Sequence, residues 1–280
     1  MFNFSLSAKG GLLCIFVGTV LALRVQASDT NVSFGFSGPE IFPIDNQITL
    51  LHAADLNGDG LTDLIVVNNA RSKINILYNQ TGKTNAALRH PAAKQQINDL
   101  PPDARFHIES ISSEKRISSL VVADLNGDGK PDLAYYGEPR ELVVQYNLGS
   151  NTWSAPKRWP IEDGQETPNA LSTGDLNGDK LTDLVLLGEN NVYYLAQNPD
   201  HTLAEPRKIP FSGSVTAVQV LDIDGDRRDD LLLVNWGAAN PFRFRLQNAA
   251  GELGPEIYFS QPAIRAYTAD DRREITKRKL

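Results

Sequence analysis

Cysteine is almost absent from this chain of 280 residues, which contains only Cys14. A single thiol cannot form an intramolecular disulfide, so the fold must be stiffened by other means. Histidine is scarce as well, with four residues scattered along the sequence, and neither HExxH nor GxSxG occurs. The carboxylates outside the repeated loops described below show no spacing typical of an acid and base pair, so nothing in the sequence selects hydrolytic catalysis.

Long apolar runs are missing too. Residues 1–27 contain Lys9 and then a mostly apolar run, Leu12–Leu23, which is shorter than the roughly 20 residues of a membrane-spanning helix. This layout is typical of a secretory signal peptide, and we favour its cleavage over a retained membrane anchor. Cleavage would remove Cys14 and leave residues 28–280 as one mature domain with no membrane span. We expect that domain to be secreted, periplasmic or at the cell surface.

Positive charge is in the minority. Without Lys9 and Arg24, residues 28–280 carry 25 basic and 34 acidic side chains, a formal charge of −9. Proteins that bind nucleic acid neutralise phosphates with clusters of lysine and arginine, so this acidic chain is not expected to have a nucleic-acid partner.

The acidity is concentrated in one repeated stretch. DLNGDGLTDL begins at Asp55 and recurs as DLNGDGKPDL from Asp124, DLNGDKLTDL from Asp175 and DIDGDRRDDL from Asp222. The copies are 69, 51 and 47 residues apart, a period typical of propellers and solenoids. The first interval is longer by about 20 residues, which we place within Gln80–Ser113 as a surface loop or a small helical excursion.

Each copy places oxygen-bearing side chains at positions 1, 3, 5 and 9, with glycine at position 4. Such a set suits Ca²⁺, which takes about six to eight oxygen ligands and tolerates irregular geometry. One such loop alone would be interpreted as a solvated turn, but four copies with the same spacing predict about four calcium sites. Four ions would reduce the formal charge from −9 to −1. The predicted ligands, loop by loop, are Asp55, Asn57, Asp59, Asp63 and the Leu61 carbonyl; Asp124, Asn126, Asp128, Asp132 and the Lys130 carbonyl; Asp175, Asn177, Asp179, Asp183 and the Leu181 carbonyl; and Asp222, Asp224, Asp226, Asp230 and the Arg228 carbonyl.

The flanks of the loops distinguish them from EF-hands. An EF-hand needs a glutamate at position 12 and a helix on each side, whereas position 12 is here Val66, Tyr135, Leu186 or Leu233. Segments such as ITLLHAAD before the first loop and DLIVVN after it are rich in β-branched and aliphatic residues. We therefore expect each acidic loop to be a metal-binding turn between two buried strands.

The recurring DLNGDGxxDL core with apolar strands on both sides resembles the FG-GAP and VCBS repeats of calcium-binding β-propellers, such as the N-terminal domains of integrin alpha subunits. The resemblance covers essentially all of residues 28–280. It implies an all-β fold in which the strand before each loop is the innermost of a four-stranded blade and the loop binds Ca²⁺ near one rim. The sequence departs from the pattern at position 6, where Lys180 and Arg227 replace Gly60 and Gly129. A positive φ there would favour glycine, and the added charge would weaken a cation site.

The two ends of the sequence predict the number of blades. GPEIFPI at 38–44 nearly repeats GPEIYFS at 254–260, and AIRAYTAD at 263–270 continues the period. We therefore expect the N-terminal and C-terminal strand pairs to close a fifth blade, which leaves no open sheet edge. The alternative is a portion of a seven-bladed ring whose other blades are missing or come from another chain.

Two functions agree with this fold. The favoured one is an adhesion-type module that binds an extracellular protein or polysaccharide; the alternative is an accessory or catalytic propeller of a polysaccharide-degrading enzyme. Trp153, Trp159 and Trp236 would offer sugar-stacking surfaces, but Trp159 lies in a predicted outer strand and is assigned to packing. His52 is expected to be a satisfied interior residue of an inner strand. The sequence determines neither the ligand nor the oligomeric state.

Overall fold

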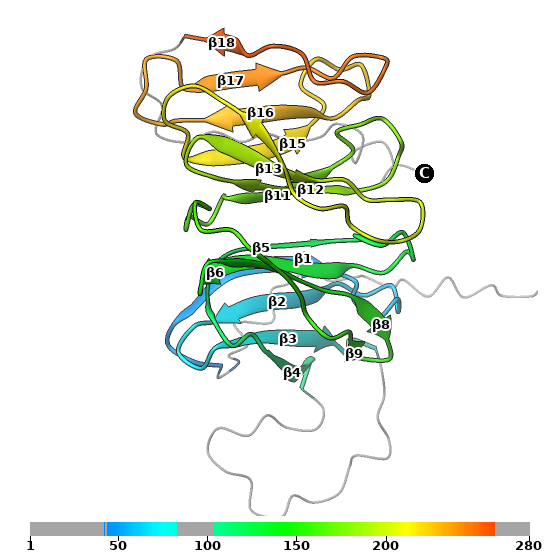
Figure 1. The fold of residues 1–280 in the computed structure, drawn as a ribbon. Helices are drawn as coiled ribbons and strands as arrows, with labels where there is room; N and C mark the ends of the chain where they lie inside the picture. Colours follow the sequence, from blue (N-terminus) through cyan, green and yellow to red (C-terminus); the bar gives the residue numbers. More distant parts are fainter. Residues whose placement is uncertain (1–41, 43, 83–103, 261–280) are drawn as a thin grey trace, which may run out of the picture. The chain divides into compact units, whose positions relative to one another are not determined.

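The aliphatic and aromatic runs on both sides of the acidic loops form β-strands, as predicted. A computed structural model describes residues 42, 44–82 and 104–260, all of which belong to one unit, 42–280. Within these residues the chain is all-β and propeller-like, with four antiparallel four-stranded sheets and one small hairpin (Figure 1). In this part of the chain no helix is long and apolar enough to cross a membrane.

Each four-stranded sheet is one blade, and each blade is built around one acidic loop, which joins its first strand to its second. Blade 1 contains β1 (Ile48–Ala54), β2 (Asp63–Asn68), β3 (Lys73–Asn79) and β4 (Phe106–Ser112). Blade 2 contains β5 (Arg116–Ala123), β6 (Asp132–Glu138), β7 (Glu141–Gln145) and β10 (Lys157–Pro160), with the hairpin of β8 (Asn147–Gly149) and β9 (Thr152–Trp153) inserted before β10. Blade 3 contains β11 (Leu171–Gly174), β12 (Asp183–Leu187), β13 (Asn191–Leu195) and β14 (Arg207–Pro210), and blade 4 contains β15 (Ala217–Leu221), β16 (Asp230–Val234), β17 (Phe242–Arg245) and β18 (Ile257–Phe259).

The second strand of a blade is apolar at successive positions because both of its faces are covered. In β6, Leu133 and Tyr135 belong to the cluster shared with blade 1, while Ala134 and Tyr136 belong to the cluster shared with blades 3 and 4. All five residues of β12 and of β16 are buried. Strands covered on both sides lose the polar alternation of a half-exposed strand, which explains runs such as DLVLL.

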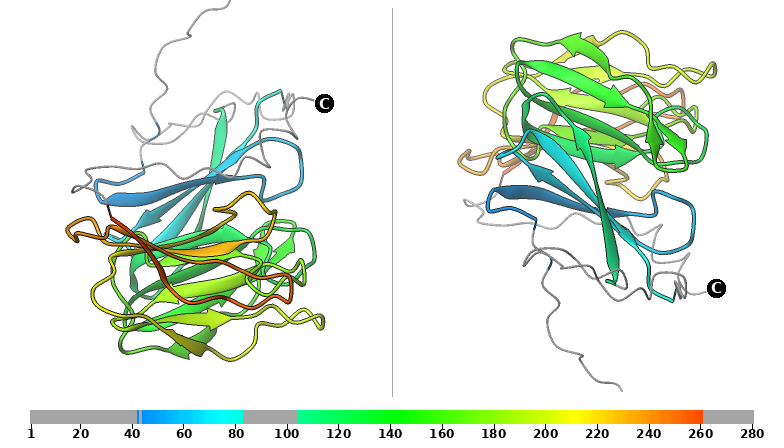
Figure 2. Two further views of the ribbon diagram at one scale, coloured as in Figure 1. Left: turned by 90° about the horizontal axis from the view of Figure 1, so that it is seen from above. Right: turned by 90° about the horizontal axis from the view of Figure 1, so that it is seen from below.

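The first strands of the blades lie next to one another. β1 contacts β5, β5 contacts β11, and β11 contacts β15; Figure 2 shows these twisted sheets from two sides. Hydrogen bonds join the neighbours: the Ile117 amide donates to Asn69 Oδ1 (2.8 Å) in the turn after β2, and the Val220 amide donates to Ser172 Oγ (3.0 Å). The strand before each acidic loop is therefore the inner strand, as the resemblance implied.

Several predictions fall on residues that the structure does not describe. The signal peptide (1–27) and almost all of the two segments that would close a fifth blade lie outside the described residues. The blade number therefore stays a prediction. In the long first interval, β4 occupies 106–112, and residues 83–103 lie outside the described chain.

A test of blade packing comes from Ser119, a fully buried residue of β5. Its hydroxyl donates to the Pro168 carbonyl (3.0 Å) and accepts the Leu171 amide (3.1 Å), so it joins blade 2 to blade 3. Ser119→Ala leaves a buried backbone N–H without this acceptor, and we expect the free energy of unfolding to fall by about 1 to 3 kcal/mol in urea titrations. Thr81→Ala, in an exposed turn, is the control and should change it by less than about 0.5 kcal/mol. Equal effects would contradict the bridging role.

Candidate metal centres

The four acidic loops share one backbone conformation. Position 4 is a glycine with positive φ in every loop, for example +73° at Gly58. Position 6 is also left-handed in all four, with φ of +80° at Gly60, +83° at Gly129, +70° at Lys180 and +73° at Arg227. The departure from glycine in the third and fourth loops therefore does not change the backbone conformation at position 6. Lys180 and Arg227 adopt a conformation that costs a non-glycine residue about 1 kcal/mol or more.

The carboxylate at position 1 shapes each loop. In the first loop, Asp55 Oδ1 accepts the Gly58 amide (2.8 Å) and Oδ2 accepts the Gly60 amide (2.8 Å). Asn57 then accepts the Asp59 amide (3.0 Å), and Asp59 accepts the Leu61 amide (2.8 Å). The position-1 carboxylates of the other loops accept the equivalent backbone amides: Asp124 from Gly127 and Gly129, Asp175 from Gly178 and Lys180, and Asp222 from Gly225 and Arg227. All four loops are therefore built alike.

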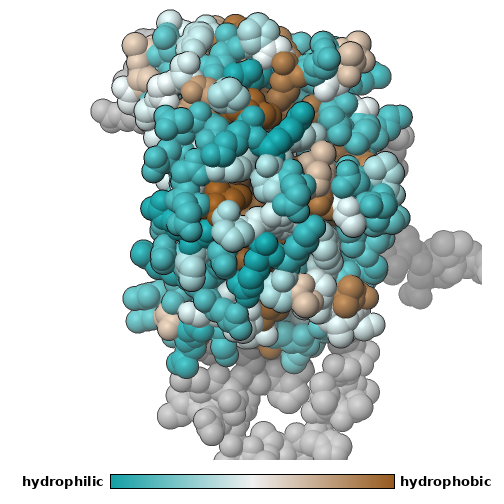
Figure 3. All heavy atoms as spheres, in the orientation of Figure 1, coloured by the Kyte–Doolittle hydropathy of each residue, from teal (hydrophilic) through white to brown (hydrophobic). Residues whose placement is uncertain are grey.

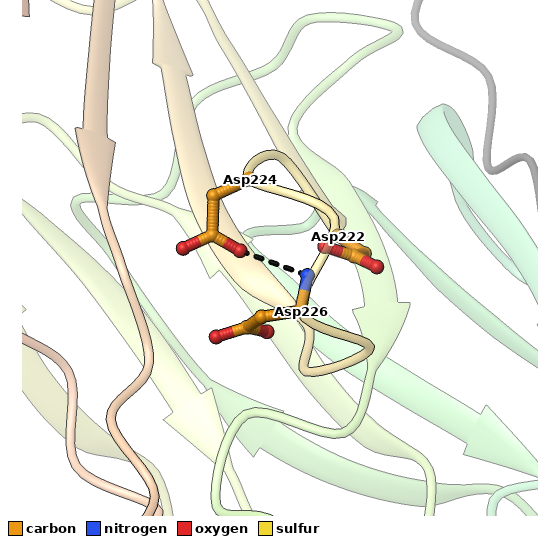
Figure 4. A group of neighbouring side chains, drawn as sticks. All are labelled: Asp222, Asp224 and Asp226. Atoms are coloured by element: carbon orange, nitrogen blue, oxygen red, sulfur yellow. Dashed lines mark hydrogen bonds between the residues drawn. The ribbon is translucent and has the colours of Figure 1, made fainter.

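The fourth loop brings three carboxylates together. Oxygen atoms of Asp222, Asp224 and Asp226 all lie within 4.8 Å of one another, and Figure 4 shows the three side chains converging from one turn. An oxygen-only set of carboxylates fits a hard cation such as Ca²⁺. In loops one to three, position 3 is asparagine, and no other such group of three acidic, histidine or cysteine side chains occurs in the described chain. Asp230 is not part of the group.

The carboxylate at position 9 has a role that the sequence analysis missed. Asp132 is fully buried; its Oδ2 accepts the Leu125 amide (2.9 Å) and its Oδ1 the Asn147 amide (2.7 Å). It thus ties the start of the loop to the chain just beyond the third strand of the blade. The other position-9 carboxylates accept the equivalent amides: Asp63 from Leu56 and Asn79, Asp183 from Leu176 and Gln197, and Asp230 from Ile223 and Gln247. Their predicted role as metal ligands is compatible with these bonds, because a carboxylate oxygen keeps a further lone pair, and it stays a prediction.

Burial controls the protonation of these carboxylates. It raises the pKa of Asp132 and of Asp183 to about 6, against the two or three hydrogen bonds that favour the charged form. Burial also raises the pKa of Asp63 and of Asp230. Each group therefore holds its proton more tightly in the folded protein than in the unfolded chain.

We expect the calcium-free protein to lose stability as the pH rises. The folded pKa of Asp132 and Asp183, about 6, exceeds the ordinary value of 3.8, so their contribution is complete below about pH 4 and is lost as the pH rises through 6. In EDTA the free energy of unfolding should fall by about 2 kcal/mol per group between about pH 4.5 and pH 7. Asp183→Asn should flatten this dependence. A stability that rises across this interval in EDTA would contradict the assignment.

The next blade covers each of the first three loops. Side-chain amides donate to loop carbonyls of the preceding blade: Asn147 to Leu56 (2.7 Å), Gln197 to Asp124 (3.1 Å) and Gln247 to Asp175 (2.8 Å). In the third of these contacts Gly251 lies so close to the Asn177 carbonyl oxygen that a Cβ would collide with it. In the second, the His201 ring donates from Nδ1 to the Asn126 carbonyl. A pattern that could have revealed this contact is an asparagine or glutamine at or just beyond the end of the third strand of every blade: Asn79, Asn147, Gln197 and Gln247.

Two loops contain their own cation at position 7. Lys130 pairs with Asp128 (2.8 Å) in the second loop, and the Arg228 guanidinium pairs with Asp226 in the fourth. Arg228 is further fixed by donating from Nε to the Gln247 carbonyl (3.0 Å). The sequence analysis assigned only the carbonyls of these two residues. Leucine occupies position 7 in the first and third loops.

The tethered guanidinium of Arg228 should compete with a bound cation. Arg228→Leu introduces the residue of the first and third loops and frees the Asp226 carboxylate. We expect calcium affinity at the fourth loop to rise about threefold to tenfold, since the ion pair is only partly buried. Terbium luminescence with isothermal titration would measure it, and Arg207→Leu, outside the loops, is the control. An unchanged or lower affinity would contradict competition.

Comparisons with known proteins found a repeat family that matches part of the chain. The FG-GAP-like repeat matches residues 124–186 and 175–233, which contain the second, third and fourth loops. The T-cell immunomodulatory proteins of Mus musculus and Rattus norvegicus are each 24% identical over 273 residues, covering 91% of this chain and 40% of their own length. The chain thus spans less than half of these curated relatives.

Matches to parts of solved structures were also found. One is described as "Crystal Structure of TcdB2-TccC3", with a TM-score of 0.35 and 19% identity over 48% of this chain and 7% of that one. Another is "Crystal structure of BBS1N in complex with ARL6DN, soaked with lead", with a TM-score of 0.29 and 14% identity over 69% of this chain and 76% of that one. The repeat match is the informative result: residues 124–233 are FG-GAP-like repeats, as the DLNGDGxxDL pattern predicted.

Proposed function

We propose that this chain is an extracellular calcium-binding β-propeller that acts as a binding module for a protein or a polysaccharide. One observation carries the calcium assignment: three carboxylates converge in the fourth loop, and that loop has the same backbone and hydrogen bonds as the other three. FG-GAP-like repeats over residues 124–233 support the same reading.

The ion would have a structural role. Ca²⁺ would neutralise the carboxylates that crowd each loop. Because each loop joins the first two strands of a blade, and the first three loops also contact the next blade, the ion would stabilise both the blade and its packing. A cation that binds only the folded chain adds stability by mass action, in a protein whose mature part has no cysteine.

A binding role is favoured over catalysis by the surface and by the centre of the described sheets. The face in Figure 3 is mainly hydrophilic, with small separate hydrophobic patches, which suits a polar ligand. Among the described residues that line the cavity between the inner strands, none is a carboxylate or a tyrosine. The carboxylates with a raised pKa, Asp132 and Asp183, instead accept hydrogen bonds from backbone amides in the interior. The propeller of a polysaccharide-degrading enzyme is therefore our second choice.

An extracellular location is part of the proposal. It depends on the secretory pattern of residues 1–27. The mouse and rat relatives are named for an action on T cells, but this chain matches only 40% of their length, so we do not propose that action for it. We propose only a location outside the cytoplasm, with the protein secreted, periplasmic or at the cell surface.

Calcium should control the stability of residues 28–280. We expect titration with Ca²⁺ to raise the melting temperature and to reveal about four bound ions by isothermal titration, and EDTA to reverse the rise. At a free concentration of about 100 times the Kd, each site adds about 2.7 kcal/mol. Asp124→Ala should remove one ion, whereas Asp200→Ala, in an exposed turn outside the loops, should remove none. A melting temperature unaffected by both calcium and EDTA would overturn the metal assignment.

The binding role is tested separately with the calcium-loaded protein. Immobilised extracellular glycans and proteins should reveal a ligand whose binding is lost in EDTA. Activity on a polysaccharide, detected as new reducing ends, would instead support the enzyme alternative.

A further inference from the structure

The first strands of all four described blades surround one cavity of about 210 Å³. It is separate from the acidic loops, since no predicted metal ligand lines it. Each of these strands contributes residues to the lining. They are His52 of β1; Val121 and Val122 of β5; Asn169, just before β11, and Leu171, Ser172 and Thr173 of β11; and Val218 and Gln219 of β15. A ligand held here would contact every described blade at once.

None of the described residues that line the cavity carries a formal charge. They include no aspartate, glutamate, lysine or arginine, although these make up 22% of the chain. Burial lowers the pKa of His52 from its ordinary value of 6.5, so the imidazole is neutral at pH 7. A charged ligand would lose its hydration without gaining an opposite charge, which is unfavourable. The cavity therefore selects against anions and cations.

The polar groups of the cavity can both donate and accept hydrogen bonds. Ser172 Oγ accepts the Val220 amide (3.0 Å), which leaves its hydroxyl hydrogen available to donate. The Thr173 hydroxyl and the exposed Asn169 amide add donors and acceptors. The His52 ring is held by a hydrogen bond to the backbone of Leu120. A ligand that matches such groups must itself both donate and accept hydrogen bonds, as hydroxyl groups do.

The remaining lining is aliphatic. Val121, Val122, Leu171 and Val218 place hydrocarbon beside the polar groups. A volume of about 210 Å³ corresponds to about seven water molecules at about 30 Å³ each, which is room for a single small ring. A pyranose has this combination of size, hydroxyl groups and apolar C–H surface.

We propose that this central cavity is a subsite for one neutral sugar residue, a terminal unit of a glycan. The inference rests on the proposed function as a binding module and names the class of its ligand. β11 and the segment before it would hold the hydroxyl groups of the sugar through Thr173, Ser172 and Asn169, and the aliphatic side chains of β5, β11 and β15 would lie against its C–H groups.

The test compares neutral and charged sugars of similar shape. Residues 28–280, loaded with calcium, are titrated with glucose, galactose and mannose, and then with glucosamine and glucuronate. The imidazole signals of His52 are followed by NMR. We expect at least one neutral sugar to shift these signals with saturation, and its charged counterparts to bind about tenfold more weakly or not at all. Charged sugars that bind as well as the neutral ones would overturn the proposal.

Two variants locate the site. Thr173→Val keeps the shape of the side chain but removes its hydroxyl, and should weaken sugar binding about threefold to tenfold. Thr81→Val, in an exposed turn of blade 1, is the matched control and should leave binding unchanged, and circular dichroism checks that both variants fold. Binding that is unaffected by Thr173→Val, or no response of His52 to any neutral sugar, would overturn the proposal. If a larger glycan or a protein still binds in that case, the proposed function survives; if nothing binds, both fail.

Discussion

The described chain depends on one interaction, a buried carboxylate that accepts backbone N–H groups from two distant points of the same blade. Asp183 shows it: one oxygen accepts the Leu176 amide at the start of the acidic loop, and the other accepts the Gln197 amide beyond the third strand. A buried carboxylate without such partners would be strongly unfavourable. The loop and the third strand must therefore keep one fixed relation, and all four blades repeat it.

The contact between blades follows from this fixed relation. Once Asp183 holds the Gln197 backbone, the Gln197 side chain reaches the Asp124 carbonyl of the preceding blade. Gln247 does the same through Asp230 and Asp175. The proposed metal loops thus lie between the carboxylate that shapes their own blade and the amide of the next one. Shape within a blade and packing between blades are two results of the same hydrogen bonds.

Much of this arrangement could be predicted from the sequence. The repeat and the flanking apolar strands are local patterns that predicted the four-stranded blades, and the resemblance that they carry implied the inner strands. The lysine and arginine at position 6 suggested a departure in the third and fourth loops, yet both residues adopt the positive φ of the glycines that they replace. The cover from Gln197 and Gln247 was missed because it joins residues more than 70 positions apart, and the recurring asparagine or glutamine near the end of the third strand was its only local sign. Local spacing also cannot tell whether an aspartate turns toward a cation or toward amides, so the amide-binding role of position 9 was missed and its metal-binding role stays a prediction. The guanidinium of Arg228 was missed because only its carbonyl was considered.

The cover over the loops gives the array a direction. A loop is completed by the blade that follows it in the chain, and never by the one before it, in the three contacts described. At the loops, loss of a following blade would leave a strained, acidic turn without its cover, whereas loss of a preceding blade would leave a side-chain amide that water satisfies easily. The unit defined by these hydrogen bonds is therefore offset from the unit that the sequence repeat displays, because it begins at one acidic loop and ends just beyond the third strand of the next blade.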